Sequence, residues 1–424
     1  MSNNHRWSLF AVVLLAASVP VRAQLPWSDQ THQIAFGDFN GDHRTDVLYI
    51  ARDPSQSSGI ALSTGSGPYA SGQTWASNFL GISWGNGNYK PIVADFNGDG
   101  KADILLQRQS PGDHYLLLAN SSGQFTAINQ TISNTLGGQT WSPDGHLIVA
   151  GDFNGDHKAD LFLQSATVSG LNAIFLANSS GNFSSAQQTW GNVHIGFQWA
   201  APKAKVYSAD FDGDGKADLF IQAKPDIVMI DYDVAFPVPV YRPGSFGIAN
   251  AKVANGNGEI FYTPALQIWD RRFQNADWSA MFYDAAVGDF NGDGKADILL
   301  QGKKAGSLNS MFLVSSNGQV STGDALTDTT IRNATGDAYR IYAVNFAGIP
   351  SSAIYMQAVS SSGTSSFSWS GTPSVGSETI TYTYDARGRL TDVSHAGTVN
   401  NNVSRHYSLD KAGNRTSVTT TGAP

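Results

Sequence analysis

Five copies of one nine-residue pattern hold the residues of this chain that are best suited to chemistry. Each copy reads Asp, any residue, Asn or Asp, any residue, Asp, three further residues and Asp. The copies begin at Asp38, Asp95, Asp152, Asp210 and Asp289. Oxygen atoms at positions 1, 3, 5 and 9, with a main-chain carbonyl at position 7, suit a hard cation such as Ca²⁺, which takes about six to eight oxygen ligands. The pattern therefore predicts about five calcium sites.

The predicted ligands in each loop are the side chains at positions 1, 3, 5 and 9 and the carbonyl at position 7. They are Asp38, Asn40, Asp42, Arg44 and Asp46 in the first loop; Asp95, Asn97, Asp99, Lys101 and Asp103 in the second; Asp152, Asn154, Asp156, Lys158 and Asp160 in the third; Asp210, Asp212, Asp214, Lys216 and Asp218 in the fourth; and Asp289, Asn291, Asp293, Lys295 and Asp297 in the fifth. Five copies in one register argue against the alternative, a solvated Asp- and Gly-rich turn without metal.

The segment after each loop distinguishes these loops from an EF-hand, which places a bidentate Glu at position 12 and enters a helix. Position 12 is here Tyr49, Leu106, Leu163, Ile221 and Leu300. The runs that follow, such as DILLQ and DLFLQ, are short, apolar and bounded by turn residues, which is typical of buried strands. We therefore expect each loop to connect two strands.

Position 6 varies in a way that predicts unequal affinities. It is Gly100, Gly215 and Gly294 in three loops, but His43 and His157 in the first and third. A sharp turn there favours a positive φ, which Gly adopts freely and His only at a cost. We expect the first and third sites to bind Ca²⁺ more weakly. The fourth site, with four carboxylates, should bind it most tightly.

The loops recur at a nearly fixed period, with first aspartates 57, 57, 58 and 79 residues apart. A sixth copy without aspartate ligands begins at Asn345, where Ile349 and Ala353 occupy positions 5 and 9. Each unit reads as about four short strands between Gly, Ser and Asn turns. Repeated units of this kind predict an all-β fold, a β-propeller of four-stranded blades with calcium-binding loops. Six units predict six blades.

The loop and its period resemble the FG-GAP or VCBS repeats of bacterial extracellular proteins and the calcium-binding blades of integrin α subunits. The resemblance implies a calcium-stabilised β-propeller over residues 24–373. Family members usually form seven blades, so the resemblance leaves seven open beside six. The extra residues between the fourth and fifth loops, within 223–268, predict a long loop on one face, a favoured place for binding.

Aromatic and amide side chains keep the same register as the loops. Trp84, Trp141, Trp199 and Trp278 each lie eleven residues before a loop, as does Trp27. These rings could stack on sugars, which makes the four a candidate ligand-binding set, or pack between blades, which we favour. The Phe at position 2 of each loop predicts core, and the recurring Gln107, Gln164, Gln222, Gln301 and Gln357 predict caps on strand hydrogen bonds.

The two ends of the chain predict export and a small appendage. Residues 1–23 combine His5 and Arg6, an apolar run and a Val-Arg-Ala site, which predicts a cleaved signal peptide and a secreted or periplasmic protein. Residues 374–424 predict a linker and two segments built on Tyr384 and Tyr407. These segments resemble the YD (RHS) repeats of toxin-complex proteins, and they also suit a small β-hairpin segment.

Composition narrows the class of function. The chain has 424 residues, no Cys and a formal net charge of −8, which becomes −10 when Arg6 and Arg22 leave with the signal peptide. Of the 34 acidic residues, 16 stand at predicted ligand positions, so the acidity is directed at metal. Nucleic-acid binding needs a basic surface and is not expected. The signal segment is too short for a membrane span.

Three classes of function remain. No catalytic constellation stands out, because the aspartates are committed as ligands and the histidines share no motif, so we expect a non-enzyme. The leading hypothesis is an adhesion or interaction scaffold, the N-terminal part of an RHS- or toxin-complex-like system. The alternative is a calcium-dependent lectin, and a polysaccharide-acting enzyme ranks third. The expected partner is a protein or a glycan.

Overall fold

A computed structural model describes residues 27–421 except 65–68, 86, 225–226, 232–237, 242–245, 250–258, 262–266, 316–317, 322–325, 327–328, 345–351, 360–365, 369–377, 385–389, 398–403 and 410–414. The chain forms two compact units, one over Pro20–Gly371 and one that contains Thr372–Pro424. The division falls two residues before the predicted boundary at 373/374. The predicted signal peptide, residues 1–23, lies outside the described residues.

Six antiparallel hairpins with one shared register form the inner half of six sheets in the larger unit. They pair β1 (His32–Gly37) with β2 (Asp46–Ala51), β7 (Tyr89–Ala94) with β8 (Asp103–Arg108), β13 (His146–Gly151) with β14 (Asp160–Ser165), β19 (Ala204–Ala209) with β20 (Asp218–Ala223), β27 (Tyr283–Gly288) with β28 (Asp297–Gly302), and β30 (Tyr339–Val344) with β31 (Ala353–Ala358). Five of the connections are the predicted loops. The expectation that each loop joins two strands is confirmed.

Outer strands complete these sheets to different extents. The third strands are β3 (Ser58–Leu62), β9 (His114–Leu117), β15 (Asn172–Phe175), β23 (Phe246–Ala249), β29 (Ser310–Phe312) and β32 (Ser366–Ser368); the fourth strands are β4 (Ala70–Trp75), β10 (Gln130–Ile132), β16 (Gln188–Trp190) and β24 (Gln267–Trp269). Within the described residues, the first four sheets thus have four strands and the last two have three.

The predicted count of six or seven four-stranded blades is therefore wrong. The described residues form five four-stranded sheets, four in this unit and one in the smaller unit. The fifth unit departs from the repeat, because the short helix α1 (Thr329–Arg332) occupies the part of the chain in which the first four units form a small hairpin, and the described residues of this unit add no fourth strand. The Asn309 amide donates to the carbonyls of Ile331 and Ala334, whereas the equivalent Asn172 donates to Trp190 of a fourth strand.

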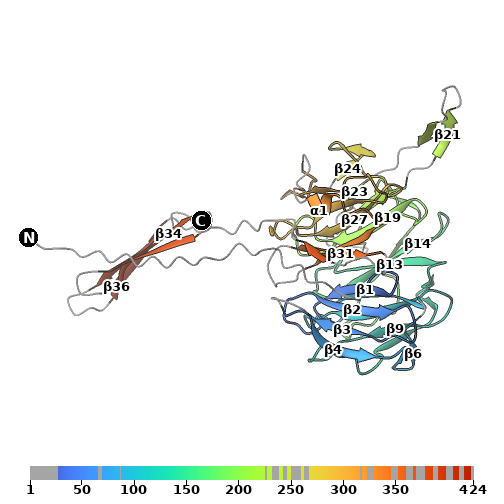
Figure 1. The fold of residues 1–424 in the computed structure, drawn as a ribbon, viewed down its shortest axis with the longest axis horizontal. Helices are drawn as coiled ribbons and strands as arrows, with labels where there is room; N and C mark the ends of the chain where they lie inside the picture. Colours follow the sequence, from blue (N-terminus) through green and yellow to red (C-terminus); the bar gives the residue numbers. More distant parts are fainter. Residues whose placement is uncertain are drawn as a thin grey trace, which may run out of the picture. The chain divides into compact units, whose positions relative to one another are not determined.

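The six sheets close into a ring. Their innermost strands contact one another in the order β1, β7, β13, β19, β27 and β30. The ring closes because Gln357 Nε2 donates to the His32 carbonyl over 3.1 Å and Asp29 N donates to the Ala358 carbonyl over 2.8 Å. Figure 1 shows the blue β1 beside the orange β31, and a shared apolar cluster of Ile34, Val344 and Tyr355 lies there. The larger unit is an all-β propeller.

Large aromatic side chains fill the spaces between neighbouring sheets. The position-2 residues Phe39, Phe96, Phe153, Phe211 and Phe290 are at most 1% exposed, which confirms them as core. Trp84, Trp141, Trp199 and Trp278 are also at most 1% exposed. Each of these four indoles donates its N–H to the carbonyl five residues earlier in the chain. Burial of this kind gives each ring both its packing and its polar partner.

Glutamine side chains connect each sheet to the next. Gln107 Nε2 donates to the carbonyls of Trp141 and His146 over 2.8 and 2.7 Å. Gln164 does the same with Trp199 and Ala204 over 2.7 and 3.0 Å. The sequence predicted caps on strand hydrogen bonds, and the structure shows that the capped carbonyls belong to the following sheet.

Replacing Gln164 by Leu should lower the free energy of unfolding by about 2 kcal/mol, because two buried carbonyls lose their donor. Gln124→Leu is the matched control, since Gln124 is exposed and its change should cost less than about 0.5 kcal/mol. Urea unfolding at saturating Ca²⁺ measures both. Equal midpoints for the two variants would contradict a connecting role for Gln164.

Four small hairpins lie beyond the fourth strands. They are β5 (Asn78–Phe79) with β6 (Ile82–Ser83), β11 (Thr135–Leu136) with β12 (Gln139–Thr140), β17 (Val193–His194) with β18 (Phe197–Gln198), and β25 (Arg272–Phe273) with β26 (Ala276–Asp277). Each turn has two residues, and both have positive φ. This is the type I′ geometry that suits a two-residue hairpin.

The segment predicted as a long loop within 223–268 contains regular structure, which corrects that prediction. Strands β21 (Ile227–Asp231) and β22 (Val238–Tyr241) pair as a hairpin, and β23 and β24 belong to the fourth sheet. The β-branched residues Ile227, Val228 and Ile230 in β21 and Val238 and Val240 in β22 favour strand pairing over an open loop.

The smaller unit is one four-stranded antiparallel sheet. It consists of β33 (Glu378–Tyr384), β34 (Leu390–Gly397), β35 (Ser404–Leu409) and β36 (Arg415–Thr421) in that order. The two predicted YD-like segments contribute one hairpin each, and their turns lie outside the described residues. None of the helices that the structure describes is long and apolar enough to cross a membrane.

Candidate metal centres

The carboxylate at position 1 is held by main-chain N–H groups of its own loop. Asp152 Oδ1 accepts from Gly155 and Asp156 over 2.6 and 3.1 Å, and Oδ2 accepts from His157 over 2.8 Å. Asp38, Asp95 and Asp289 make the same three bonds. The loop backbone therefore fixes the orientation of this carboxylate before any ligand binds.

Positions 3, 5 and 7 continue the same arrangement. In the second loop, Asn97 Oδ1 accepts from Asp99 N over 3.0 Å, and Asp99 Oδ1 accepts from Lys101 N over 2.9 Å. The Lys101 ammonium lies 2.8 Å from Asp99 Oδ2. The same ion pair forms in all five loops, between positions 5 and 7. The prediction for position 7 concerned only its carbonyl and not this ion pair, although the basic residue in every copy is a signal for it.

The carboxylate at position 9 is buried at the start of each second strand. Asp160 is fully buried, and its two oxygens accept from Phe153 N over 3.1 Å and Ala177 N over 2.9 Å. Burial raises the pKa of Asp160 to about 7, against the opposing effect of these two N–H groups. The pKa values of Asp46, Asp103 and Asp297 rise to about 7 for the same reason. The raised pKa values mean that the surrounding groups do not fully compensate the negative charge of these buried carboxylates.

The donor atoms of the loops have the chemistry that a calcium ion requires. An ionised carboxylate has about four lone-pair sites, and Asp152 uses three of them for N–H groups. In the fourth loop, carboxylate oxygens of Asp210, Asp212 and Asp218 lie within 4.8 Å of one another. Burial is the largest cause of a raised pKa at Asp210, with neighbouring aspartates adding to it. A divalent cation would compensate this concentration of negative charge.

Position 6 has the backbone geometry that the sequence predicts. His43 and His157 have φ of 63° and 65°, and Gly100, Gly215 and Gly294 have φ of 81° to 85°. The left-handed turn is therefore common to all five loops, and two of them place a Cβ in it.

His157→Gly should stabilise the third loop by about 0.5–1 kcal/mol and raise its affinity for Ca²⁺ several-fold, because the Cβ penalty disappears. Gly100→Ala is the reverse change, and a Cβ at Gly100 would meet nothing within 4 Å, so it tests φ alone. Calorimetric Ca²⁺ titration of both variants measures the effect. An unchanged third site in His157→Gly would show that backbone strain does not set its affinity.

Neighbouring loops contact one another around the ring. The N–H at position 8 of one loop donates to the position-1 carbonyl of the preceding loop over 2.7 Å, at Ala102, Ala159, Ala217 and Ala296. The position-7 lysine also packs on the position-4 glycine of the preceding loop, as Lys158 does on Gly98. The predicted metal ligands of one site are thus mechanically connected to those of the next.

The four tryptophans proposed for ligand stacking are not at a surface. Trp84, Trp141, Trp199 and Trp278 lie in separate spaces between sheets, and their burial leaves no ring face for a sugar. The described structure supports the packing role and does not support the stacking role.

The fold and the repeated loops define the larger unit as a β-propeller with acidic loops between its inner strands. Residues 38–106 and 95–163 match the FG-GAP-like repeat, and residues 281–307 match the FG-GAP repeat. Together with the ring of sheets, these matches support an FG-GAP β-propeller.

Solved structures with a similar arrangement include binding proteins and enzymes. An Agrocybe aegerita lectin is 18% identical over 88% of this chain and 82% of its own, with a TM-score of 0.49. A Burkholderia pseudomallei lectin is 16% identical over 93% and 99%, with a TM-score of 0.41. A Bacillus licheniformis rhamnogalacturonan lyase is 13% identical over 95% and 68%, with a TM-score of 0.30. These values say nothing about what this chain binds. No curated protein matches the chain.

Proposed function

We propose that this chain is an exported β-propeller that binds about five Ca²⁺ ions and acts as an adhesion or interaction scaffold. The observation that carries the proposal is the shared loop geometry. In each of the first three loops and the fifth, three main-chain N–H groups hold the position-1 carboxylate, and the fourth loop gathers three aspartates within 4.8 Å. Such preorganised oxygen donors suit a cation of this size and charge.

The scaffold role fits the way in which calcium would act here. Extracellular calcium modules bind at about 10⁻⁴–10⁻³ M, so the sites would fill outside a cell and stay empty in cytosol. Filled loops would rigidify the ring after export, in a chain that has no Cys for disulfides. The rigid ring would then present its outer surfaces to a protein or glycan partner. We infer that the protein acts by binding and not by catalysis.

The smaller unit suggests the larger system in which the scaffold works. Its sheet includes both YD-like segments, around Tyr384 and Tyr407. We propose that these segments belong to an RHS- or toxin-complex-like assembly, with the propeller as the part that contacts a target.

Isothermal titration of the mature chain with CaCl₂ tests the metal part of this proposal. About five sites, with the fourth loop the tightest, are expected. Asp212→Asn supplies the matched variant, because it gives the fourth loop the Asn that the other four loops have at position 3. In this variant the number of sites should stay at about five, and the affinity of the fourth site should fall to that of the second and fifth loops, whose nine residues it then shares. A folded chain that takes up no Ca²⁺ at millimolar concentration would overturn the proposal.

A glycan array, probed in calcium and again with chelator, separates the scaffold from the lectin alternative. Calcium-dependent binding to a narrow set of glycans would identify a lectin. A blank array with folded protein would favour a protein partner.

A further inference from the structure

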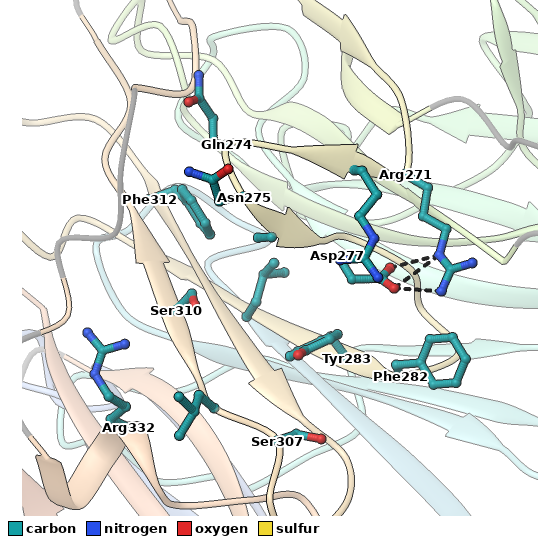
Figure 2. A pocket seen from close by; sticks show the side chains of 14 residues that line it. Arg271, Gln274, Asn275, Asp277, Phe282, Tyr283, Ser307, Ser310, Phe312 and Arg332 are labelled. Atoms are coloured by element: carbon teal, nitrogen blue, oxygen red, sulfur yellow. Dashed lines mark hydrogen bonds and ion pairs between the residues drawn. The ribbon is translucent and has the colours of Figure 1, made fainter.

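A pocket of about 670 Å³ lies between the outer hairpin β25–β26 of the fourth sheet and strand β29 of the fifth (Figure 2). Leu300, Phe312 and Tyr283 form an apolar part of its lining, and Ser307 and Ser310 add hydroxyl groups from the fifth sheet. The volume is in the range of small-molecule sites, which is about 300–1,000 Å³.

The pocket lies where the repeat pattern changes. The fifth sheet forms no fourth strand among its described residues, and helix α1 contributes Arg332 to the lining instead. Between the second and third sheets the equivalent hairpin packs tightly, because a Cβ added to Gly137 would lie 2.7 Å from Phe175 and 3.1 Å from Ala186 N. The same space is therefore filled in one part of the ring and open in another.

The turn of the fourth hairpin also departs from the other three. The second turn residue is Gly81, Gly138 and Gly196 in the first three hairpins, which suits a positive φ. In the fourth it is Asn275 at φ 62°, preceded by Gln274 at φ 51°. Both side chains line the pocket, at its upper rim in Figure 2. Two consecutive residues in this conformation cost free energy, and such strain is concentrated at functional sites.

Positive charge exceeds negative charge in the lining. Arg271, Arg272 and Arg332 line the pocket, with Asp277 as the single acid among the lining residues. Arg271 pairs with Asp277 over 2.6 Å and lies 5.2 Å from the Phe282 ring centre. The main chain of Arg272 pairs with Asp277 in hairpin β25–β26, whereas its side chain is exposed and makes no hydrogen bond or ion pair with the described residues. Its guanidinium group is available to an anionic ligand.

We propose that this pocket binds an acidic sugar, a carboxylate-bearing pyranose unit of a glycan. The planar guanidinium of Arg272 matches a carboxylate with two parallel hydrogen bonds. The amides of Gln274 and Asn275 and the hydroxyls of Ser307 and Ser310 suit sugar hydroxyl groups, and Tyr283 offers an aromatic surface to the C–H face of the ring. No lining residue belongs to a calcium loop, so the inference goes beyond the metal-dependent function proposed above.

Calorimetric binding of tetragalacturonate to the full mature chain, at saturating Ca²⁺, tests the proposal. Its methyl ester and a neutral galactose tetramer serve as ligands without the carboxylates. Arg272→Ala should weaken binding at least about 10-fold, and Arg272→Lys should lose most of it because an ammonium cannot make the paired bonds. Lys304→Ala is the matched control, since Lys304 is an exposed cation between β28 and β29 that does not line the pocket. The affinity of the Lys304→Ala variant for tetragalacturonate should stay within about twofold of that of the parent chain.

A second variant separates binding from folding. Asn275→Gly relieves the turn, so it should raise the melting temperature and at the same time weaken tetragalacturonate binding. Three results would overturn the proposal: no binding to the folded parent chain, equal affinity in Arg272→Ala, or displacement by inorganic phosphate at equal concentration, which would mark a simple anion site. Failure of the calcium titration alone would overturn only the metal proposal.

Discussion

Chelation of Ca²⁺ should lower the melting temperature of the mature chain by about 10 °C or more. A ligand that binds only the folded state adds RT ln(1 + [L]/Kd), which is about 1.4 kcal/mol per site at ten times Kd. Five such sites would add about 7 kcal/mol in the absence of coupling. Differential scanning calorimetry in about 2 mM CaCl₂ and in excess EDTA measures the change in melting temperature. The calcium concentration follows from the expected range of affinity.

Two features of the loops make this effect large. Without the metal, each loop holds several carboxylates a few ångströms apart, and like charges at that distance repel. The position-8 N–H of each loop also bonds to the position-1 carbonyl of the loop before it, so disorder in one loop weakens its neighbour. We therefore expect loss of metal to loosen the ring over a narrow range of free Ca²⁺ and not one site at a time.

Magnesium is the informative control for the chelation experiment. Mg²⁺ has the same charge but demands a smaller octahedral site and gives up its water reluctantly. It should restore only a minor part of the lost melting temperature. Equal melting curves in calcium and in EDTA would contradict a structural role for the loops.

The sequence predicted those features that a local pattern determines. The loops, their strands and the left-handed turn at position 6 all follow from nine consecutive residues, and they appear where expected. Whether the tryptophan rings are buried depends on contacts with the next sheet, which the sequence does not show. The sequence therefore left both packing and ligand stacking open. The helix α1, which stands where the other units have a small hairpin, had a signal, because Ala334 lies eleven residues before the sixth copy where the other units have Trp. That position was not interpreted as the loss of a hairpin.

The arginine-lined pocket could not be predicted from the repeat. It results from a hairpin of one unit and a helix of the next, which the periodic pattern treats as equivalent to all the others. Within the hairpin, Asn275 stands where the other three turns have Gly, and this difference becomes informative once the turns are aligned in space.

Asp160→Ala should destabilise the chain in calcium and in chelator alike, whereas Asp156→Ala should do so only in calcium. Both are predicted ligands of the third site, so each variant should lose that site. Asp160 is fully buried and satisfies the N–H groups of Phe153 and Ala177 even without metal. Asp156 is exposed, and Lys158 is its ion-pair partner among the described residues.

The expected magnitudes follow from these surroundings. Two buried N–H groups without an acceptor cost about 1–3 kcal/mol each. Because burial raises the pKa of Asp160 to about 7, the variant recovers part of the cost of burying that carboxylate. The net loss in EDTA should therefore be about 2–3 kcal/mol for Asp160→Ala. For Asp156→Ala it should stay below about 1 kcal/mol, since an exposed ion pair contributes little.

Urea unfolding in EDTA and in calcium gives all four values, and each variant serves as the control for the other. Equal stability of the two variants in EDTA would show that the N–H contacts of Asp160 do not hold the strand ends together. A loss for Asp156→Ala that is the same in both conditions would mean that the third loop takes no metal. The predicted pattern, in which one aspartate acts in both states and the other only with calcium, separates the part of each loop that builds the sheet from the part that binds the ion.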